Sequence, residues 1–308
     1  MGIVTFLSSA SGVRSQAPPT SDVVEAPALP ALYDDLDRLE GTFGVVVRAR
    51  VGFVRSDYPA IDSAEARGRA ASTVIRSHYA VVPRVRLGVR VPLLDTNPEL
   101  PGSSVVTERA FGSPELLVDW AIPQREGLVW NLRLGVGVPM GAGSADPEAP
   151  LLQNKAFALV HAVHGGYDPE LHQPGRMAIT PSARLHYHGD WFHAGALLKT
   201  AALIQIGDGA SSGRGDTRPL AYLGVVGGHA MAQPVPWFYV GVRSWLSMDI
   251  VAPTSVQGEG PTPVDFSLEP QLTFVIADRV QISATTTFVI LGELAGVIAP
   301  GVHLGLVL

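Results

Sequence analysis

Basic side chains recur at even spacing in two segments of this chain. Arg48 and Arg50 are two residues apart, and Arg84, Arg86 and Arg90 repeat the even spacing. Because successive side chains of a strand point to opposite faces of a sheet, each group would place its guanidinium groups on one face. Such a face raises the local concentration of anions and repels cations. The spacing therefore indicates an electrostatic role for these residues.

Further charged residues fall on the same face of their own segments. If the sheet closes into a barrel, this polar face would line its lumen. The whole set expected on it is Arg48, Arg50, Arg84, Arg86, Arg90, Glu115, Asp119, Arg133, Arg184, Lys199, Arg243, Asp249 and Glu269. Basic residues outnumber acidic ones in it, although the whole chain has a formal net charge of −6. Two interpretations stay open. The basic surplus can line a pore that favours anions, or arginine–carboxylate pairs can fill a narrow interior as a polar core, which is the commoner arrangement.

The elements that would position these residues are strands. From Leu128 to Pro139, apolar and polar side chains alternate almost without error, and the period of two returns down to Leu308. This period predicts strands with one apolar and one polar face. About ten residues are enough for a tilted strand to cross a bilayer. The predicted strands are Thr42–Arg55, Ser72–Tyr79, Arg84–Pro92, Pro114–Ile122, Leu128–Pro139, Arg176–His188, Trp191–Ile206, Pro219–Ala232, Trp237–Ile250, Asp265–Ile276, Val280–Ile290 and Gly301–Leu308.

Composition narrows the class of protein. Charged residues make up 16% of the 308 residues, and there is no cysteine, whereas an average soluble protein carries roughly 25% charge. The mean hydropathy is +0.23, yet no apolar run reaches the ~18 residues of a membrane-spanning helix. The acidic balance argues against nucleic acid as a partner. A chain that is apolar in sum but never in a run is typical of a transmembrane β-barrel.

Connection lengths and aromatic residues agree with that class. Short joints near Val82, Gln124, Gly189, Gln233 and Asp278 alternate with mostly long connections. Short turns on one rim and long loops on the other are typical of outer-membrane barrels, with the short turns facing the periplasm. Aromatic residues near the strand ends fit interfacial girdles, and they are Tyr58, Tyr79, Trp120, Tyr187, Trp191 and Trp237.

We therefore expect an all-β fold, a single up-and-down antiparallel outer-membrane barrel of about 12 strands over residues 41–308. Residues 1–17 resemble a truncated signal peptide, and residues 18–40 would form a periplasmic tail or a plug. The region 140–175 is irregular in sequence, and its Ala-rich piece, Lys155–Val163, predicts either a helix or an extra strand.

Other chemistry finds little support in the sequence. His186, His188 and His193 could approach one another and bind Zn²⁺, but no cysteine or well-placed carboxylate joins them. Ser182 and His186 would lie roughly 13 Å apart along a strand, too far for a hydrogen bond. No G-x-S-x-G motif is present. We expect no enzymatic activity, no metal and no cofactor, which disfavours an envelope lipid hydrolase.

Several short motifs carry a family resemblance. They are the stretch Phe111–Leu116, the strand end Leu134–Gly141 and the hairpin around His78–Val89. With these the chain resembles Gram-negative outer-membrane barrels of the phenol-degradation transporter and porin-like group. The stretch Gly166–Pro181 is similar to uncharacterised barrels of predatory and social bacteria. The resemblance implies a barrel in the outer membrane and carries over no catalytic residue.

The expected function is passive diffusion or transport of a small solute, either anionic or apolar, through the lumen. The alternative is a non-conducting structural or adhesive barrel whose loops at 93–111 and 140–175 contact other surfaces. The expected partners are membrane lipid and lipopolysaccharide, a small-molecule solute and the barrel-assembly machinery, with no nucleic acid.

Overall fold

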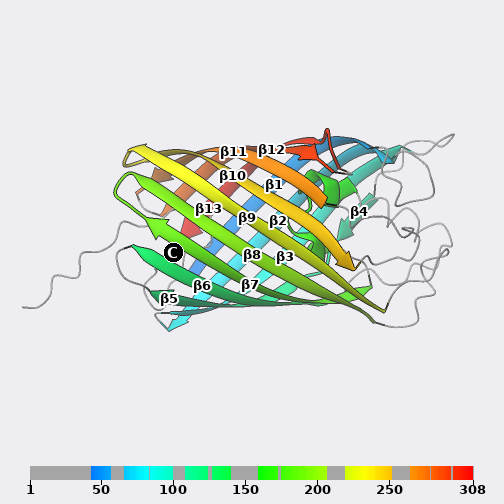
Figure 1. The fold of residues 1–308 in the computed structure, drawn as a ribbon, viewed down its shortest axis with the longest axis horizontal. Coiled ribbons are helices and arrows are strands. Elements are labelled where there is room, and N and C mark those ends of the chain that lie inside the picture. The colour runs from blue at the N-terminus through cyan, green and yellow to red at the C-terminus, as the bar shows by residue number, and fades with distance from the viewer. Residues whose placement is uncertain are drawn as a thin grey trace, which may run out of the picture.

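The computed structural model describes residues 43–56, 66–82, 84–99, 108–123, 127–139, 159–172, 175–206, 219–251, 264–277, 279–292 and 294–307. Almost all of them are in strands (Figure 1). The strands are β1 (Phe43–Ser56), β2 (Ala66–Val82), β3 (Val85–Glu99), β4 (Glu108–Phe111), β5 (Glu115–Pro123), β6 (Leu128–Gly137), β7 (Arg176–His188), β8 (Phe192–Gln205), β9 (Leu220–Val235), β10 (Phe238–Val251), β11 (Val264–Ile276), β12 (Val280–Leu291) and β13 (Ile298–Val307).

Every strand pairs antiparallel with its neighbours, and the sheet closes on itself. The closure joins β1 to β13, from Gly44 opposite Val307 to Phe53 opposite Ile298. The short β4 and the longer β5 both pair with β3 and together occupy one place in the wall. The wall therefore has 12 strand positions, which confirms the predicted up-and-down barrel. Within the described residues, no helix is both long and apolar enough to cross a membrane.

Strands β2 and β3 are longer than the sequence predicted. The prediction ended the third strand at Pro92, a residue that has no N–H to give to a ladder. In the structure, Pro92 lies opposite the break between β4 and β5, where Gly112 N donates to Pro92 O at 3.0 Å. The pairing of β2 with β3 then continues to Arg67 opposite Glu99. The hairpin is extended at the rim that carries the long connections.

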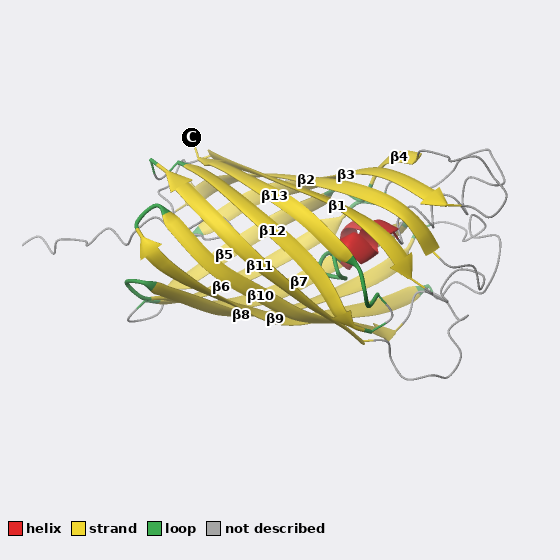
Figure 2. Cartoon of the chain, turned by 90° about the horizontal axis from the view of Figure 1, so that it is seen from above, coloured by secondary structure: helices red, strands yellow, loops and turns green. Residues whose placement is uncertain are grey.

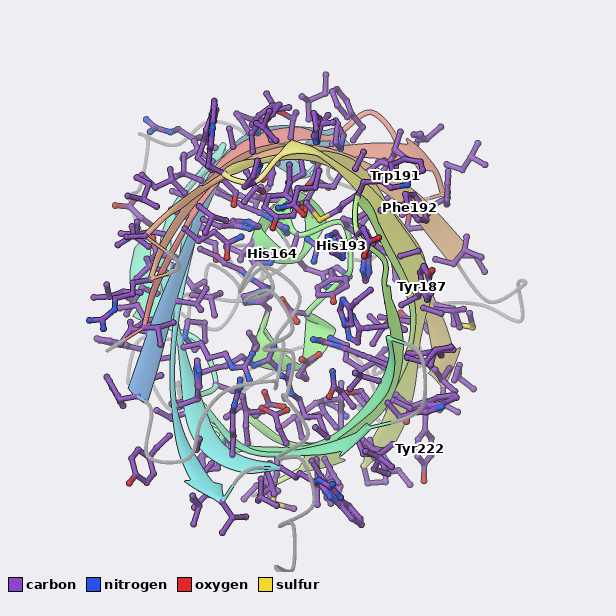
Figure 3. The ribbon with its side chains drawn as sticks, turned by 90° about the vertical axis from the view of Figure 1, so that its left-hand side faces the viewer. His164, Tyr187, Trp191, Phe192, His193 and Tyr222 are labelled. Carbon is purple, nitrogen blue, oxygen red and sulfur yellow. The ribbon has the colours of Figure 1, made fainter. Side chains whose placement is uncertain are left out.

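The two faces of the wall differ as the alternation predicted. On β13, Val302, Leu304 and Leu306 are 54%, 46% and 38% exposed, while His303 between them is buried. Figure 3 shows Tyr187, Trp191 and Tyr222 outside the wall and His193 inside it. An apolar outer surface around a polar interior is the arrangement that a bilayer requires of a barrel.

Exposed aromatic side chains gather at the rim with the short turns. Tyr79, Trp120, Tyr187, Trp191 and Trp237 are all exposed at strand ends or in the turns on this side. This position is that of an interfacial girdle. Tyr58, the sixth predicted member, lies outside the described residues, as do the proposed signal peptide and the tail or plug at 18–40.

The connection between β6 and β7 folds into the barrel. Residues 159–163 are helical, a turn follows, and the 3-10 helix η2 (Pro169–His172) ends the described part. Figure 2 shows the helical part enclosed by strands near the long-loop end. The helical alternative for this piece is thus confirmed for 159–163. The described residues 159–172 lie inside the barrel. The non-conducting alternative had expected the loop at 140–175 to contact other surfaces.

Candidate functional site

Charged residues of the interior form three clusters of buried ion pairs. In the first, Glu269 of β11 is fully buried and forms ion pairs with Arg50 of β1 and Arg243 of β10. Arg243 stands directly opposite Glu269 in the pairing of β10 with β11. Thr287 Oγ1 of β12 donates a further hydrogen bond to Glu269 Oε2 at 2.7 Å. The cluster therefore ties four strands together on the inside.

The second cluster lies around Asp119 of β5. Arg76 Nη2 of β2 is 2.6 Å from Asp119 Oδ2, and Arg133 of β6, the cross-strand neighbour of Asp119, pairs with Oδ1. Both arginines thus approach one carboxylate from different strands. A buried carboxylate with two guanidinium partners satisfies most of its acceptor sites, which is what its burial requires.

The third cluster joins the wall to the inward-folded segment 159–172. Arg90 of β3 contacts Glu115 at 2.6 Å, Asp168 at 2.9 Å and Glu170 at 2.8 Å. Lys199 Nζ of β8 lies 3.2 Å from Asp168 Oδ1 and 3.1 Å from Glu170 Oε2. The two acidic residues of the segment, Asp168 and Glu170, therefore connect β3 with β8 through their ion pairs.

Electrostatics in the third cluster follow from burial and from these cations. Burial alone would raise the pKa of the Asp168 carboxyl, but the charges of Lys199 and Arg90 hold that pKa well below its usual range. Burial, with the charge of Asp168 added to it, raises the pKa of Glu170. Asp168 is therefore the firmly ionised member of the pair.

A tight turn at Gly165 and Gly166 lets the segment lie against β10 and β11. Both glycines have positive φ, 56° and 69°, and a Cβ on Gly165 would lie 2.5 Å from Ser267 Oγ. Trp245 Nε1 donates to the carbonyl oxygen of Gly165 at 2.7 Å. The ring of Tyr167 meets the ring of Trp245 edge to face, with centroids 5.3 Å apart.

A cavity of about 20 Å³ lies beside Tyr167. Leu197 and Gly227 add apolar surface to its lining, and the residues with polar groups there are Arg48, Tyr167, Arg184, His186, His229, Arg243 and Ser244. This volume holds about one or two water molecules. The guanidinium of Arg243 lies 4.5 Å from the centroid of the Tyr167 ring, within the range of a cation–π contact.

Most residues of the predicted lumen set lie inside the wall. Arg50, Arg86, Arg90, Glu115, Asp119, Lys199, Arg243 and Glu269 are buried, and Arg48, Arg133, Arg184 and Asp249 are partly accessible. Arg84 differs, because it precedes the first residue of β3 and its side chain is exposed at the short-turn rim. Whether the enclosed residues line a conducting pore stays a prediction.

Sequence reasoning missed several members of these clusters. Arg76 shares the inner face with Ser72 and His78, so its parity on a longer β2 would have found it. Trp245 shares its parity with Arg243 and Asp249, so the period of two already places it on the inner face. The sequence does not signal which group its ring contacts there. Asp168 and Glu170 lie in a stretch without any period, so only the packed structure brings them to Arg90.

The histidines proposed as zinc ligands do approach one another. The ring centroids of His186 and His188 are 5.9 Å apart, and those of His188 and His193 are 5.8 Å apart. His229 joins them, 5.4 Å from His186. Across the described parts of the chain, however, no three histidine or acidic side chains are arranged to hold a metal ion.

Comparisons with known proteins bear on the fold. No protein-family model matches the chain, and no curated protein matches it. Among solved structures, it is similar to an outer-membrane channel from Pseudomonas putida F1, with a TM-score of 0.62 and 12% identity over 89% of this chain and 98% of that one. The fold is that of an outer-membrane barrel. At 12% identity the likeness supports the fold and gives no residue roles.

Other similar structures are more distant. The translocator domain of the autotransporter NalP from Neisseria meningitidis gives a TM-score of 0.49 at 9% identity, over 90% of this chain and 92% of that domain. The NanC porin gives 0.47 at 7% identity, over 84% of this chain and 98% of the porin. The exposed apolar outer face, the aromatic girdle and the closed sheet make this chain a membrane-spanning barrel of the outer-membrane type.

Proposed function

We propose that this chain is an outer-membrane channel that passes a small solute through its lumen. The observation that carries the proposal is the ionic lining of the interior, built from Arg50, Arg76, Arg90, Lys199 and their carboxylate partners. Buried ion pairs contribute little net stability compared with apolar packing of the same volume. A barrel selected for stability alone has no need of so many, whereas a path for a hydrated solute does.

The charge of the lining favours an anionic solute over an apolar one. The cavity beside Tyr167 is lined by three arginines, and none of the described residues lining it is Asp or Glu. A lining with this sign of charge favours anions over cations. Membership in the phenol-degradation transporter group, suggested by the short motifs, is part of the same proposal.

The deciding experiment is single-channel recording of the folded protein in planar bilayers. We expect conductance steps and, in a salt gradient, a reversal potential displaced toward that of the anion. The single substitution Arg243→Gln should reduce that displacement, because Arg243 lines the cavity. A barrel shown to be folded by heat-modifiable gel mobility, yet silent at every voltage, would refute the channel function.

A second function, a non-conducting structural barrel, is favoured by a different observation. The segment 159–172 crosses the interior and is tied to β3 and β8 through Arg90 and Lys199. The cavity beside it holds water-sized species only. In this case the recordings stay silent in the wild-type protein and also in the variant Asp168→Asn, which weakens the tie to Lys199.

A further inference from the structure

Single carboxylate oxygens of the inward-folded segment contact cations from two strands that are not neighbours in the wall. Asp168 Oδ1 lies 2.9 Å from Arg90 Nη1 of β3 and 3.2 Å from Lys199 Nζ of β8. Glu170 Oε1 repeats this arrangement, at 2.8 Å from Arg90 Nη2 and 3.1 Å from Lys199 Nζ. In the sheet, β5, β6 and β7 separate β3 from β8. The closed wall thus brings two cations to one point of the interior, where the chain's own side chains show how a carboxylate binds between them.

More negative than positive charge takes part in these ion pairs. Glu115 of β5 also pairs with Arg90, so three carboxylates share two cations. Burial raises the pKa of Glu170, and the charges of Asp168 and Glu115 add to that rise, so the neighbouring carboxylates oppose one another here. Glu115 belongs to the wall, whereas Asp168 and Glu170 lie on the segment. If the two carboxylates of the segment leave, the three remaining groups carry one net positive charge.

The segment has a place at which it can turn. Gly165 and Gly166 have positive φ, and a Cβ on Gly166 would lie 2.3 Å from Ser247 Oγ. The carbonyl oxygen of Gly165 accepts a hydrogen bond from Trp245 Nε1, which fixes the chain to β10 up to that residue. Without a Cβ, glycine reaches more backbone conformations than other residues. A rotation about Gly166 would therefore move the two carboxylates and leave the helical residues 159–163 packed in the apolar cluster.

We propose that Arg90 and Lys199 bind the carboxylate group of a small organic acid. The two carboxylates of the segment, Asp168 and Glu170, occupy this site as a tethered ligand, and the solute displaces them as the segment turns about Gly166. The site rests on the proposed channel function, because it names the class of the solute and the step that admits it. Its occupancy is measurable whether or not the barrel conducts.

The exchange is balanced on the charged side and opposed on the apolar side. Departure of the segment alone would leave the buried Lys199 without an anion, which is costly, whereas an incoming carboxylate pairs with both cations. Leu171 is buried, and its carbonyl oxygen accepts a hydrogen bond from Ser113 N at 3.0 Å. These contacts hold the segment closed until a solute supplies the replacing charge. A ligand shifts an equilibrium only by its preference for one state, so a solute without a charge leaves the segment in place.

The test measures hydrogen exchange of the full chain folded in detergent at neutral pH, while sodium acetate replaces sodium chloride at constant ionic strength. Acetate is the probe because it carries the proposed carboxylate on a single methyl group. If acetate binds with the segment turned away, exchange of the amides of 167–172 should rise about tenfold at a tenfold excess of acetate over its dissociation constant. The amides of 159–163 and of β12 should not change, because neither lies beyond the turn. An equal rise in all three regions, or no rise in 167–172 across the titration, would overturn the site.

Matched variants assign the response to the two sides of the site. Lys199→Gln should abolish most of the acetate response, because one of the two cations is lost. Arg279→Gln is its control, since it removes a positive charge from the exposed turn between β11 and β12. Asp168→Asn weakens the tethered ligand, so it should raise exchange of 167–172 before any acetate is added, and Asp190→Asn in an exposed turn should not. A full acetate response in Lys199→Gln, or equal exchange in Asp168→Asn and Asp190→Asn, would overturn the proposal.

The wild-type titration covers the case in which Lys199→Gln does not fold, because it needs no variant. Its outcome is also separate from that of the channel. A barrel that is silent in planar bilayers but shows the acetate response loses the channel function and keeps the site, whereas a conducting barrel without an acetate response loses the site alone.

Discussion

The two ends of the inward-folded segment are held by opposite kinds of contact. At its helical end, Leu159, Val160 and Val163 are buried in an apolar cluster, and Leu294 and Val297 of the β12–β13 connection complete it. At its other end, Asp168 and Glu170 form ion pairs with Arg90 and Lys199. The same fourteen-residue stretch, 159–172, is therefore held at its two ends by different contacts. We call the buried residues Leu159, Val160 and Val163 its apolar anchor, and the ion-paired residues Asp168 and Glu170 its ionic anchor.

The difference indicates which end of the segment can respond to a change in pH. Apolar burial does not depend on the charge state of titratable groups, so it does not respond to pH. The strength of an ion pair depends on the charge state of both partners, and buried pairs contribute little net stability while they are costly to break singly. We infer that the helical end fixes the segment in the barrel and that the position of the charged end depends on its ion pairs.

The largest effect is expected from the cluster around Glu269. Glu269→Gln leaves Arg50 and Arg243 buried without their shared carboxylate, which should cost about 3–5 kcal/mol in the free energy of unfolding. Urea unfolding in lipid vesicles measures it. Asp190→Asn removes the same charge from an exposed turn residue and should change the free energy by less than about 0.5 kcal/mol. If both variants lose equal stability, the cluster does not have the role assigned here.

A smaller loss is expected from the apolar anchor. Leu294 is 2% exposed within the apolar cluster, so Leu294→Ala should destabilise the barrel by about 2–4 kcal/mol through the lost burial and the cavity left behind. Its neighbour Ala295 is exposed on the same connection. Ala295→Ser is therefore the matched control and should be close to neutral under the same urea titration. A neutral Leu294→Ala would mean that the helical end is not the fixed end.

The comparison also shows what sequence alone could predict. The strands were predictable because each alternates between lipid and interior, so a period of two runs through nearly every wall segment. The charged inner set was largely predictable for the same reason, from Arg50 to Glu269. Arg84 is the exception among the described residues. Its even spacing from Arg86 and Arg90 predicts an inward side chain, but it precedes the first residue of β3 and is exposed at the rim. Outside a strand, alternation does not determine which way a side chain points.

The inward segment was not predictable to the same degree. It has no lipid-facing side, so its residues show no alternation, and the partners of Asp168 lie far away in sequence at Arg90 and Lys199. The contact of Trp245 was not predictable either, because its partner, the carbonyl oxygen of Gly165, lies in the inward segment. Such contacts depend on closure of the barrel, which joins strands that are distant in the chain.

Acid should loosen the segment by a graded amount. Burial lowers the pKa of His161 to about 4 and of His172 to about 3, and burial also lowers the pKa of His164. A released segment would titrate near 6.5, so it binds more protons than the packed one below that pH. The stability of the packed position is therefore complete above about pH 6.5 and falls as the pH drops toward 4.

Hydrogen exchange of the amides of 159–172 at pH 7 and pH 4.5, corrected for its intrinsic pH dependence, measures this change. Amides of β12 serve as the internal reference, since that strand stays in the wall. His172→Gln removes one titrating group and should reduce the acid response by a corresponding share. Equal protection of the segment at both pH values would show that its position does not depend on these histidines.

The smallest effect is expected where the two kinds of anchor meet. Trp245 is 1% exposed, packs against Tyr167 and donates its Nε1 hydrogen to Gly165 O. Trp245→Phe keeps an aromatic ring but leaves that carbonyl with weaker donors from Ser247 and Ser267, so a loss of about 1 kcal/mol is expected. In urea unfolding, Phe274→Leu, a change on the lipid-facing side of β11, is the control for losing aromatic surface. If Trp245→Phe matches wild type, the turn is held by packing alone, and the ionic anchor at Asp168 becomes the main fixing point for that end of the segment.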